Sequence, residues 1–476
     1  MATQGRLRRF PDGFLFGTKS SAYQMEGSVD ADGRGRSIWD TFSHTPGRTR
    51  NGDNGDITAD SYRHIDQDLD LLGDLGAPAY CFSIAWPRVQ PDGAGPANQR
   101  GLDFYRRLVE SLRGRGIVPV PTLFHWDLPQ ALQDRGGWMA RDTAHRFAEY
   151  ASMVAAALGD GVEMWFTHNE PWCASWVAHA RGEHAPGWRD LGAAAAATHH
   201  LLLSHGEAVS AIRSAAPRAR VGIDLNLQPI RPASQDEADL AAARRVDGNL
   251  NRLFLDPVLR GEYPADMLEH YAARKPGFSV MAEGDLEVIS QPLDFLGVNY
   301  YGPETVCAPE RMDAARGAGY WVPREPPRDE MYGDLRMVRL FRPGVERTPM
   351  DWEVDPAGLT EVLLRVSADY APPPMYVMEN GRAADDYVDP GGRIQDVSRI
   401  DYLRSHMGAV LDALERGADV RGYFVWSLLD NYEWSHGFSK RFGLVWVDYP
   451  TGARVPKASF GWYRDTVRAR ALADAS

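Results

Sequence analysis

The chain has 476 residues, of which 44% are hydrophobic and 11% aromatic, so it can bury one or two full hydrophobic cores. This composition argues against a disordered chain. The net charge is -13, and no cluster of Lys and Arg is long enough to follow a phosphate backbone, which argues against nucleic acid as a partner.

The cysteines and the apolar segments bear on the cellular compartment. Cys81, Cys173 and Cys307 lie far apart and fit neither a disulfide framework nor a zinc site, which favours a reducing compartment. No run reaches the ~18 apolar residues of a membrane span, and the arginines near the N-terminus are not followed by an apolar stretch. We therefore expect a cytoplasmic protein with no membrane partner.

Short apolar runs that end in polar residues recur along the chain, with helical periodicity between them. Eight such runs predict strands, at 14–19, 79–86, 118–126, 163–171, 220–227, 293–301, 375–381 and 420–431. The clearest helices are predicted at 101–116, 142–160, 198–216 and 399–417. Apolar strands that are each followed by a helix are typical of a parallel sheet covered by helices.

Eight strand-helix units predict an α/β protein, a single (β/α)8 TIM barrel over residues 1–476, with long loops after the strands accounting for the extra length. The alternative is an open doubly wound sheet. That fold would require a glycine-rich phosphate-binding turn after an early strand, and the sequence has no G-x-G-x-x-G or Walker A motif in such a place.

Polar and aromatic side chains mark the carboxyl ends of the predicted strands, which surround the site of chemistry in a barrel of this kind. The fourth and seventh strands each end in an acid beside an asparagine, at Asn169-Glu170 and Glu379-Asn380. A carboxylate at the end of a buried strand is costly unless it has a role. The other ends contribute His125, Trp126, Asn299, Tyr301 and Trp426, followed by Glu433 and Trp434.

These residues lie in motifs that resemble glycoside hydrolase family one, the family of retaining β-glucosidases. The most specific motifs are SAYQMEG (21–27), FSIAWPRVQPDGAG (82–95), TLFHWDLPQAL (122–132), HNEPW (168–172), DFLGVNYYGP (294–303), ENG (379–381) and WSLLDNYEWSHGFSKRFGL (426–444). The resemblance covers essentially the whole chain. It implies a retaining exo-β-glycosidase, most often a β-glucosidase with some tolerance for galactose or fucose, that needs no cofactor and no metal.

The resemblance implies that Glu170 is the acid/base and Glu379 the nucleophile. A glycosidic bond breaks through a cation-like transition state, so one carboxyl protonates the departing oxygen while the other attacks the anomeric carbon, and retention requires the two to lie ~5 to 5.5 Å apart. Because Glu170 must stay protonated until attack, we expect the nearby charge of Glu379 to raise its pKa.

The resemblance also implies a shell of residues around the sugar. Those that resemble the hydroxyl-binding residues are Gln24, His125, Trp126, Asn169 and Glu433. Trp426 and Trp434 resemble the indoles that stack on the sugar, Tyr301 resembles the tyrosine that hydrogen-bonds the nucleophile, and Asn299 shares its strand end. The acid at 433 favours an unphosphorylated sugar, because a carboxylate repels phosphate.

The sequence departs from the family beside the nucleophile. The family has Tyr-Arg-Phe-Ser, and its arginine pairs with the nucleophile, whereas this chain has Cys81 at the arginine position. Loss of a guanidinium removes a charge-assisted hydrogen bond and raises the nucleophile's pKa. Lys19, one of only four lysines, replaces a small residue on the neighbouring first strand. We hypothesise that Lys19 supplies the missing cation; the alternative is that it points outward or pairs elsewhere.

The segment 302–356 is too long for an ordinary connection and is predicted to form the rim on the leaving-group side. Its Tyr320, Trp321, Met331 and Tyr332 favour an apolar or aromatic aglycone, or they pack as a small local cluster. The expected partner is a small-molecule β-glycoside. Two other functions stay open: an enzyme that transfers glycosyl groups to an unusual acceptor, and a sugar-binding protein with impaired catalysis.

Overall fold

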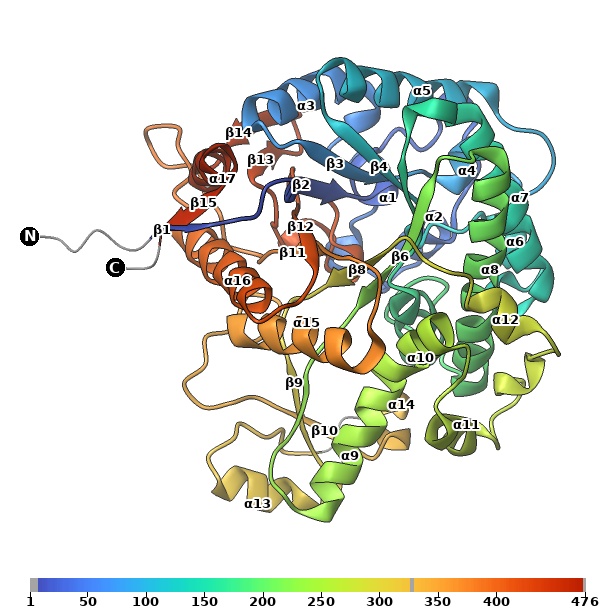
Figure 1. Ribbon diagram of the computed structural model, residues 1–476, viewed down its shortest axis with the longest axis vertical. Coiled ribbons are helices and arrows are strands. Elements are labelled where there is room, and N and C mark those ends of the chain that lie inside the picture. Colours follow the sequence, from blue (N-terminus) through green and yellow to red (C-terminus); the bar gives the residue numbers. More distant parts are fainter. Residues whose placement is uncertain (1–6, 326–328, 474–476) are drawn as a thin grey trace, which may run out of the picture.

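The computed structural model describes residues 7–325 and 329–473. Eight parallel strands close into a barrel in the order β11-β12-β2-β3-β4-β5-β6-β8, so the predicted (β/α)8 class is confirmed (Figure 1). These strands are β2 (Leu15–Ser20), β3 (Ala79–Ser83), β4 (Val118–Phe124), β5 (Met164–Asn169), β6 (Arg220–Asn226), β8 (Phe295–Asn299), β11 (Met375–Asn380) and β12 (Val420–Trp426). Each of them overlaps one of the eight predicted runs.

A helix follows each barrel strand and packs around the barrel (Figure 1). The eight are α3 (Ser61–Leu75), α5 (Gln99–Gly114), α7 (Arg141–Leu158), α8 (Leu191–Ala215), α10 (Leu253–Arg260), α15 (Pro356–Tyr370), α16 (Val397–Glu415) and α17 (Ala458–Ala469). Three of the four predicted helices agree to within two residues at each end, whereas α8 begins seven residues before the predicted start at 198. Its first turns are alanines, which favour helix without any amphipathic period, and Asp190 caps them by accepting from Ala193 N at 2.9 Å.

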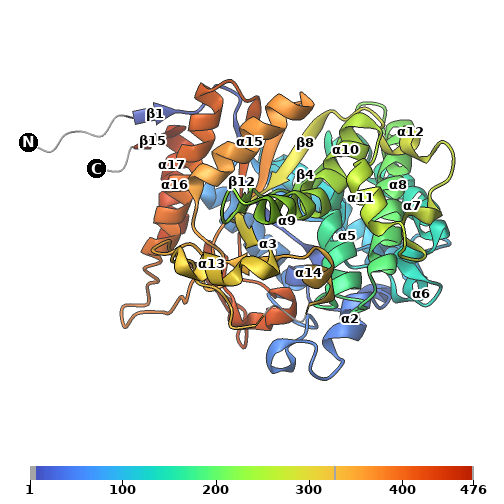
Figure 2. The same cartoon turned by 90° about the horizontal axis from the view of Figure 1, so that it is seen from below.

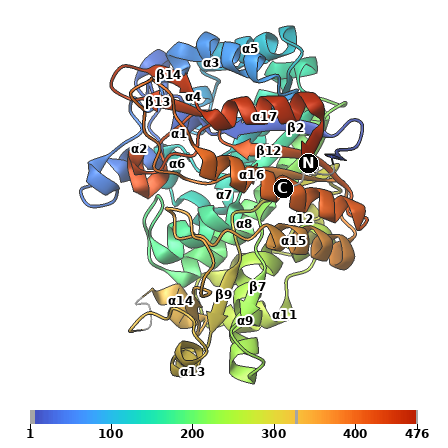
Figure 3. The same ribbon diagram turned by 90° about the vertical axis from the view of Figure 1, so that its left-hand side faces the viewer.

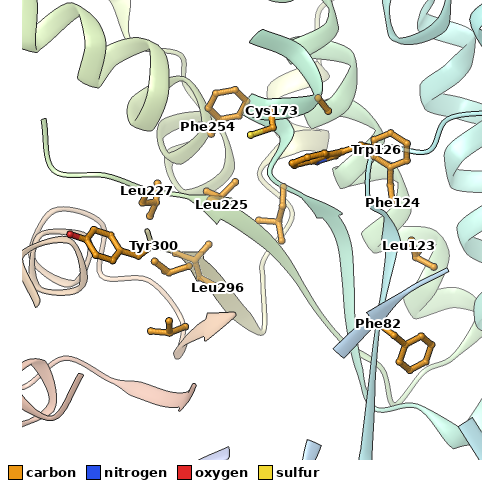
Figure 4. Close-up of a cluster of buried hydrophobic side chains, with 14 of the residues drawn as sticks. Phe82, Leu123, Phe124, Trp126, Cys173, Leu225, Leu227, Phe254, Leu296 and Tyr300 are labelled. Atoms are coloured by element: carbon orange, nitrogen blue, oxygen red, sulfur yellow. The ribbon is translucent and has the colours of Figure 1, made fainter. Parts of the chain in front are cut away.

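Alternating side chains of the barrel strands fill two layers. The interior layer consists of Ala79, Cys81, Val120, Met164, Phe166, Phe295, Tyr376, Met378 and Phe424. The outward side chains form a much larger core with the surrounding helices, and Figure 4 shows part of it, including Leu225, Leu296 and Phe254. Because the barrel is closed and filled, it holds the carboxyl ends of its strands as a rigid rim.

A small sheet is added on one side of the barrel (Figure 3). It has the order β10-β9-β7, formed by β7 (Ile230–Pro232), β9 (Glu304–Cys307) and β10 (Val338–Leu340). The helices α9 (Glu237–Asp247), α13 (Met312–Gly317) and α14 (Glu330–Asp334) accompany it, and all three lie in front of the barrel in the view from below (Figure 2). The described residues of the segment 302–356, which is predicted to form the rim, therefore include regular structure, in elements too short to show a period in the sequence.

Shorter elements complete the chain. They are β1 (Leu7–Arg9), α1 (Ala22–Met25), α2 (Ile38–Ser43), α4 (Trp86–Val89), α6 (Gln130–Gln133), α11 (Ala265–Tyr271), α12 (Asp285–Ile289), β13 (Val445–Asp448), β14 (Ala453–Pro456) and β15 (Ala471–Ala473). All three cysteines are free and buried. Within the described ranges, none of the helices combines the length and apolarity that crossing a bilayer requires.

Candidate active site

A cavity of about 330 Å³ lies at the carboxyl ends of the barrel strands. Eight of the predicted site residues line it: His125, Trp126, Glu170, Tyr301, Glu379, Trp426, Glu433 and Trp434. The structure therefore brings both predicted catalytic acids to one cavity, although 209 positions separate them in the sequence. Of the five remaining predicted residues, Gln24, Asn169, Asn299 and Lys19 contact residues of this lining. Cys81 lies in the barrel interior, where it pairs in register with Lys19.

Irregular pairing at the ends of β5 and β11 aims the two acids. On β11, Val377 pairs with Val298 and Glu379 with Asn299, so one extra residue is inserted and Glu379 faces inward instead of outward. On β5, a similar shift between Phe166 and Asn169 turns His168 out of the barrel, where it packs on Phe147 with ring centroids 4.5 Å apart. Strict alternation would have placed His168 inside and Glu379 outside.

Three residues of the same rim have a strained backbone. Trp126, Glu170 and Trp434 have φ values of 78°, 45° and 47°, in the left-handed region that side chains with a Cβ rarely adopt. Each such residue costs on the order of 1–3 kcal/mol, and such strain accumulates where a site fixes its side chains. All three residues line the cavity.

Glu379 contacts one hydrogen-bond donor and one positive charge. The Tyr301 hydroxyl donates to Glu379 Oε2 at 2.8 Å, and Lys19 Nζ lies 2.9 Å from Glu379 Oε1. The next residue fixes the strand end, because Asn380 Nδ2 donates to Tyr300 O at 2.7 Å and Asn380 Oδ1 accepts from Tyr423 at 2.6 Å. A positive charge and a hydroxyl donor both stabilise an ionised carboxylate.

Gly381 follows Asn380, and a glycine is required there because the backbone of Trp426 lies very close. A Cβ at Gly381 would lie 2.0 Å from Trp426 O, so Gly381→Ala is expected to lower the free energy of unfolding by about 2 kcal/mol or more. Denaturant unfolding measures this change. The control is Gly408→Ala within α16, where the nearest atom to a new Cβ is 3.8 Å away; it is expected to be neutral or stabilising by up to ~1 kcal/mol. Equal stability of the two variants would contradict the steric explanation.

Glu170 lies in surroundings that favour its protonated form. Burial raises its pKa to about 8, and the charge of Glu379 adds to the increase. Asn299 Nδ2 donates to Glu170 Oε1 at 2.8 Å, and the Cys173 thiol donates to Oε2 at 3.1 Å; both bonds partly oppose the shift. Cys173 was not among the predicted site residues. Its position could have indicated the contact, because a residue three places after Glu170 in a helical turn lies on the same side as Glu170.

The predicted hydroxyl-binding residues form a connected network. Asn169 Nδ2 donates to His125 Nε2 at 3.0 Å, and burial together with the charge of Lys19 lowers the pKa of His125, so its ring is neutral. Gln24 donates to Tyr432 O at 2.9 Å and lies 3.5 Å from Glu433 Oε2. Burial, followed by the charges of Glu379 and Glu170, raises the pKa of Glu433 to about 8.

Indole rings form one wall of the cavity. The Trp434 ring lies 4.5 Å from that of Trp126 and 4.5 Å from that of Trp39, and Trp426 stacks on His125 with centroids 5.7 Å apart. Packing on other rings holds each indole in place, which leaves a flat apolar surface for the C–H face of a sugar.

Lys19 lies inside the barrel and does not point outward. Its ammonium contacts Asp224 of β6, and it donates to Asn169 Oδ1 at 2.6 Å. Asp224 was not predicted from the sequence, although an acid within the apolar run 221–225 requires a buried cation. Cys81 pairs with Lys19 in register, and its buried thiol has a pKa raised to about 12, which keeps it neutral.

The four rim residues were predicted either to contact the aglycone or to pack as a local cluster, and the structure shows two in the cavity lining and two outside it. Met331 and Tyr332 line the cavity together with Leu335 and Met337. Tyr320 instead packs against the local cluster of the small sheet. Trp321 is 56% exposed and packs on Phe341, with ring centroids 5.2 Å apart.

Comparison with known proteins agrees with this geometry. The profile of glycosyl hydrolase family 1 matches residues 6–471. Thermostable beta-glucosidase B of Thermobispora bispora is 48% identical over 97% of this chain and 91% of its own length, and the bifunctional beta-D-glucosidase/beta-D-fucosidase of Bifidobacterium breve is 45% identical over 96% and 97%. The family 1 β-glucosidase of Thermotoga maritima, solved with isofagomine lactam, superimposes with a TM-score of 0.89 at 42% identity and covers 98% of this chain and 100% of that one. The protein is a member of glycosyl hydrolase family 1.

Proposed function

We propose that this glycoside hydrolase is a retaining exo-β-glucosidase in which Glu379 is the nucleophile and Glu170 the acid/base. The observation that carries the assignment is the contrast between two buried carboxyls in one cavity. Glu379 receives a hydroxyl donor and an ammonium, whereas burial raises the pKa of Glu170 to about 8. One acid is thereby suited to attack as a carboxylate, and the other to give up a proton.

The reaction follows from these two states. Glu170 protonates the glycosidic oxygen while a carboxylate oxygen of Glu379 forms a bond to the anomeric carbon, and the aglycone leaves as an alcohol. The charge of Glu379 is then lost in the glycosyl ester, which lowers the proton affinity of Glu170. Glu170 can now take a proton from water, and the resulting hydroxide displaces Glu379 and gives the sugar with its original configuration.

The sugar itself is proposed to be unphosphorylated β-glucose, bound by the predicted shell. His125, Trp126 and Glu433 contact the cavity directly, and Trp426 and Trp434 supply stacking surface. Gln24, Asn169 and Asn299 support that lining through hydrogen bonds. The relative from Bifidobacterium breve, which also acts as a β-D-fucosidase, supports tolerance at one sugar position. Solved relatives with bound inhibitors such as deoxynojirimycin support a small-molecule glycoside as the partner.

Two further assignments accompany this proposal. We propose one catalytic domain over residues 1–476, supported by the pairing of β1 with β15, which joins the two ends of the described chain beside the barrel. We also propose a reducing, cytoplasmic location, supported by the three free, buried cysteines.

A trapping experiment tests the proposed mechanism. The protein is incubated with a 2-deoxy-2-fluoro-β-glucosyl donor and, separately, with an aryl β-glucoside, and its mass is measured. Turnover together with a fluoroglycosyl adduct on Glu379 is the expected result. Saturable sugar binding with neither turnover nor adduct would replace the proposal by a sugar-binding protein. An adduct that is released only after an acceptor is added would indicate a glycosyl-transfer enzyme.

The wall formed by Met331, Leu335 and Met337 favours an apolar aglycone, since these side chains and the neighbouring Val246 and Leu250 line the cavity. Met337→Gln is therefore expected to lower kcat/KM for octyl β-glucoside about 10-fold relative to cellobiose, because an amide replaces an apolar contact. Steady-state kinetics with both substrates measures this ratio.

Trp321→Ala is the control for that ratio, since this indole belongs to the same segment but is 56% exposed. It is expected to leave the ratio unchanged. A ratio that changes with Trp321→Ala but not with Met337→Gln would place the aglycone elsewhere.

A further inference from the structure

One buried ion pair crosses the floor of the site. Lys19 of β2 and Asp224 of β6 are four strands apart in the eight-strand order, so they reach each other across the barrel interior. Neither side chain is exposed to solvent. The same ammonium lies 2.9 Å from Glu379 Oε1 and donates to Asn169 Oδ1 at 2.6 Å.

The ammonium is thus surrounded by three oxygens from three strands. A lysine ammonium has three N–H donors and no preferred plane, so a single contact would leave its position along a flexible side chain undefined. Asp224 and Asn169 approach it from β6 and β5, and Glu379 approaches it from β11. Three contacts in different directions define one position for the charge.

The barrel leaves room for this arrangement. Cys81, which pairs in register with Lys19, is small enough to let the lysine side chain run across the interior. Gly297 does the same for the acid, because a Cβ there would lie 2.8 Å from Asp224 Oδ1. Apolar side chains such as Phe166 and Phe424 fill the interior below, so each charge depends on the other for compensation.

We propose that Asp224 is a positioning residue for the nucleophile: it holds the Lys19 ammonium against Glu379 across the barrel. The inference rests on the proposed role of Glu379. Asp224 does not line the cavity described above, and it acts through Lys19.

Asp224 and Glu379 also share one positive charge. Burial alone would lower the pKa of Lys19, but the charges of Asp224 and Glu379 raise it above its usual value, so the ammonium persists. Burial raises the pKa of Asp224 to about 7 against the opposing charge of Lys19. The titratable groups that interact with this pair are Cys81, His125, Glu170 and Glu379.

The charge of Asp224 contributes to the raised pKa of Glu170. Removing that charge with Asp224→Asn is therefore expected to lower the pKa of Glu170, and the basic limb of kcat/KM against pH should move to lower pH. Since the ammonium loses the negative charge of one of its three partners, kcat/KM at the optimum should fall about 10- to 100-fold. The measurement is the pH profile of aryl β-glucoside hydrolysis.

The matched control is Asp68→Asn. Asp68 forms a buried ion pair with Arg454, at 2.9 Å, between α3 and the β13-β14 hairpin. This control is expected to lower Tm without moving either limb of the pH profile. A profile that moves equally in both variants, or in neither, would overturn the positioning role.

A double-mutant cycle decides the question even if Asp224→Asn alone folds poorly. Lys19→Met leaves Asp224 without its cation, so the double variant with Asp224→Asn should have a higher Tm than Lys19→Met alone. If Asp224 acts through Lys19, kcat/KM of the double variant should stay within about threefold of Lys19→Met. Independent, multiplicative losses, together with no gain in Tm, would refute the inference.

Failure of the positioning role of Asp224 can be distinguished from failure of the proposed role of Glu379. If the wild-type protein hydrolyses aryl glucosides and forms the adduct on Glu379, while Asp224→Asn keeps the wild-type profile and rate, only the positioning role fails. If the wild-type protein forms no adduct, the assignment of Glu379 fails first.

Discussion

Glu379→Gln is expected to lower kcat/KM for aryl β-glucosides by at least ~10⁴-fold, the scale of loss seen when a nucleophile is removed. The amide keeps the shape of the side chain and can still accept from Tyr301, but it carries no charge to attack the anomeric carbon or to pair with Lys19. Steady-state kinetics measures the loss, and intact mass after treatment with a fluoroglycosyl donor should show no adduct.

Glu353→Gln is the control for this substitution. Glu353 is a buried glutamate outside the cavity, and it accepts from Arg342 Nε at 2.6 Å. Its replacement should lower stability and leave kcat unchanged. A Glu379→Gln variant that retained a tenth of the wild-type activity would exclude Glu379 as the nucleophile.

Glu170→Gln is expected to have an effect that depends on the leaving group. For alkyl glucosides, whose oxygen must be protonated as it leaves, kcat/KM should fall by about 10²- to 10⁴-fold, whereas the formation of the glycosyl-enzyme from dinitrophenyl glucoside should change little. The comparison of the two substrates in the pre-steady state measures this difference. An equal loss for both would mean that Glu170 does not act as the acid.

The pH dependence of kcat/KM provides a second test of Glu170 as the acid. Because burial raises its pKa to about 8, the acid is protonated below that value and the wild-type kcat/KM should fall as the pH rises through it. In Glu170→Gln this basic limb should disappear, since the amide does not titrate. A limb that persists would belong to another group, such as Glu433.

The barrel could be predicted because its signals are repeated. Each strand is an apolar run followed by a periodic helix, and the local composition is sufficient to recognise both. The helix α8 was predicted too short because its alanines carry no period, and the three strands of the small sheet are only three or four residues long. A repeating sequence pattern can be recognised only in an element that is long enough to show the repeat.

Individual site residues were predictable to different degrees. Glu170 and Glu379 stand in motifs at strand ends, and Lys19 could be placed near the nucleophile because it lies on a strand next to Cys81. Asp224 could not, since its partner is 205 positions away and on the far side of the barrel. The extra residue that turns Glu379 inward is equally hidden, because a shift of one position leaves the apolar pattern almost unchanged.

The small sheet described above has its own hydrophobic cluster, which includes Cys307, Met312 and Leu340. It lies beside the barrel, and Met337 immediately precedes its strand β10, whereas both carboxyls lie at the ends of barrel strands. Substitutions in the small sheet can therefore change which leaving group is accepted, while the two carboxyls that break the glycosidic bond stay unchanged.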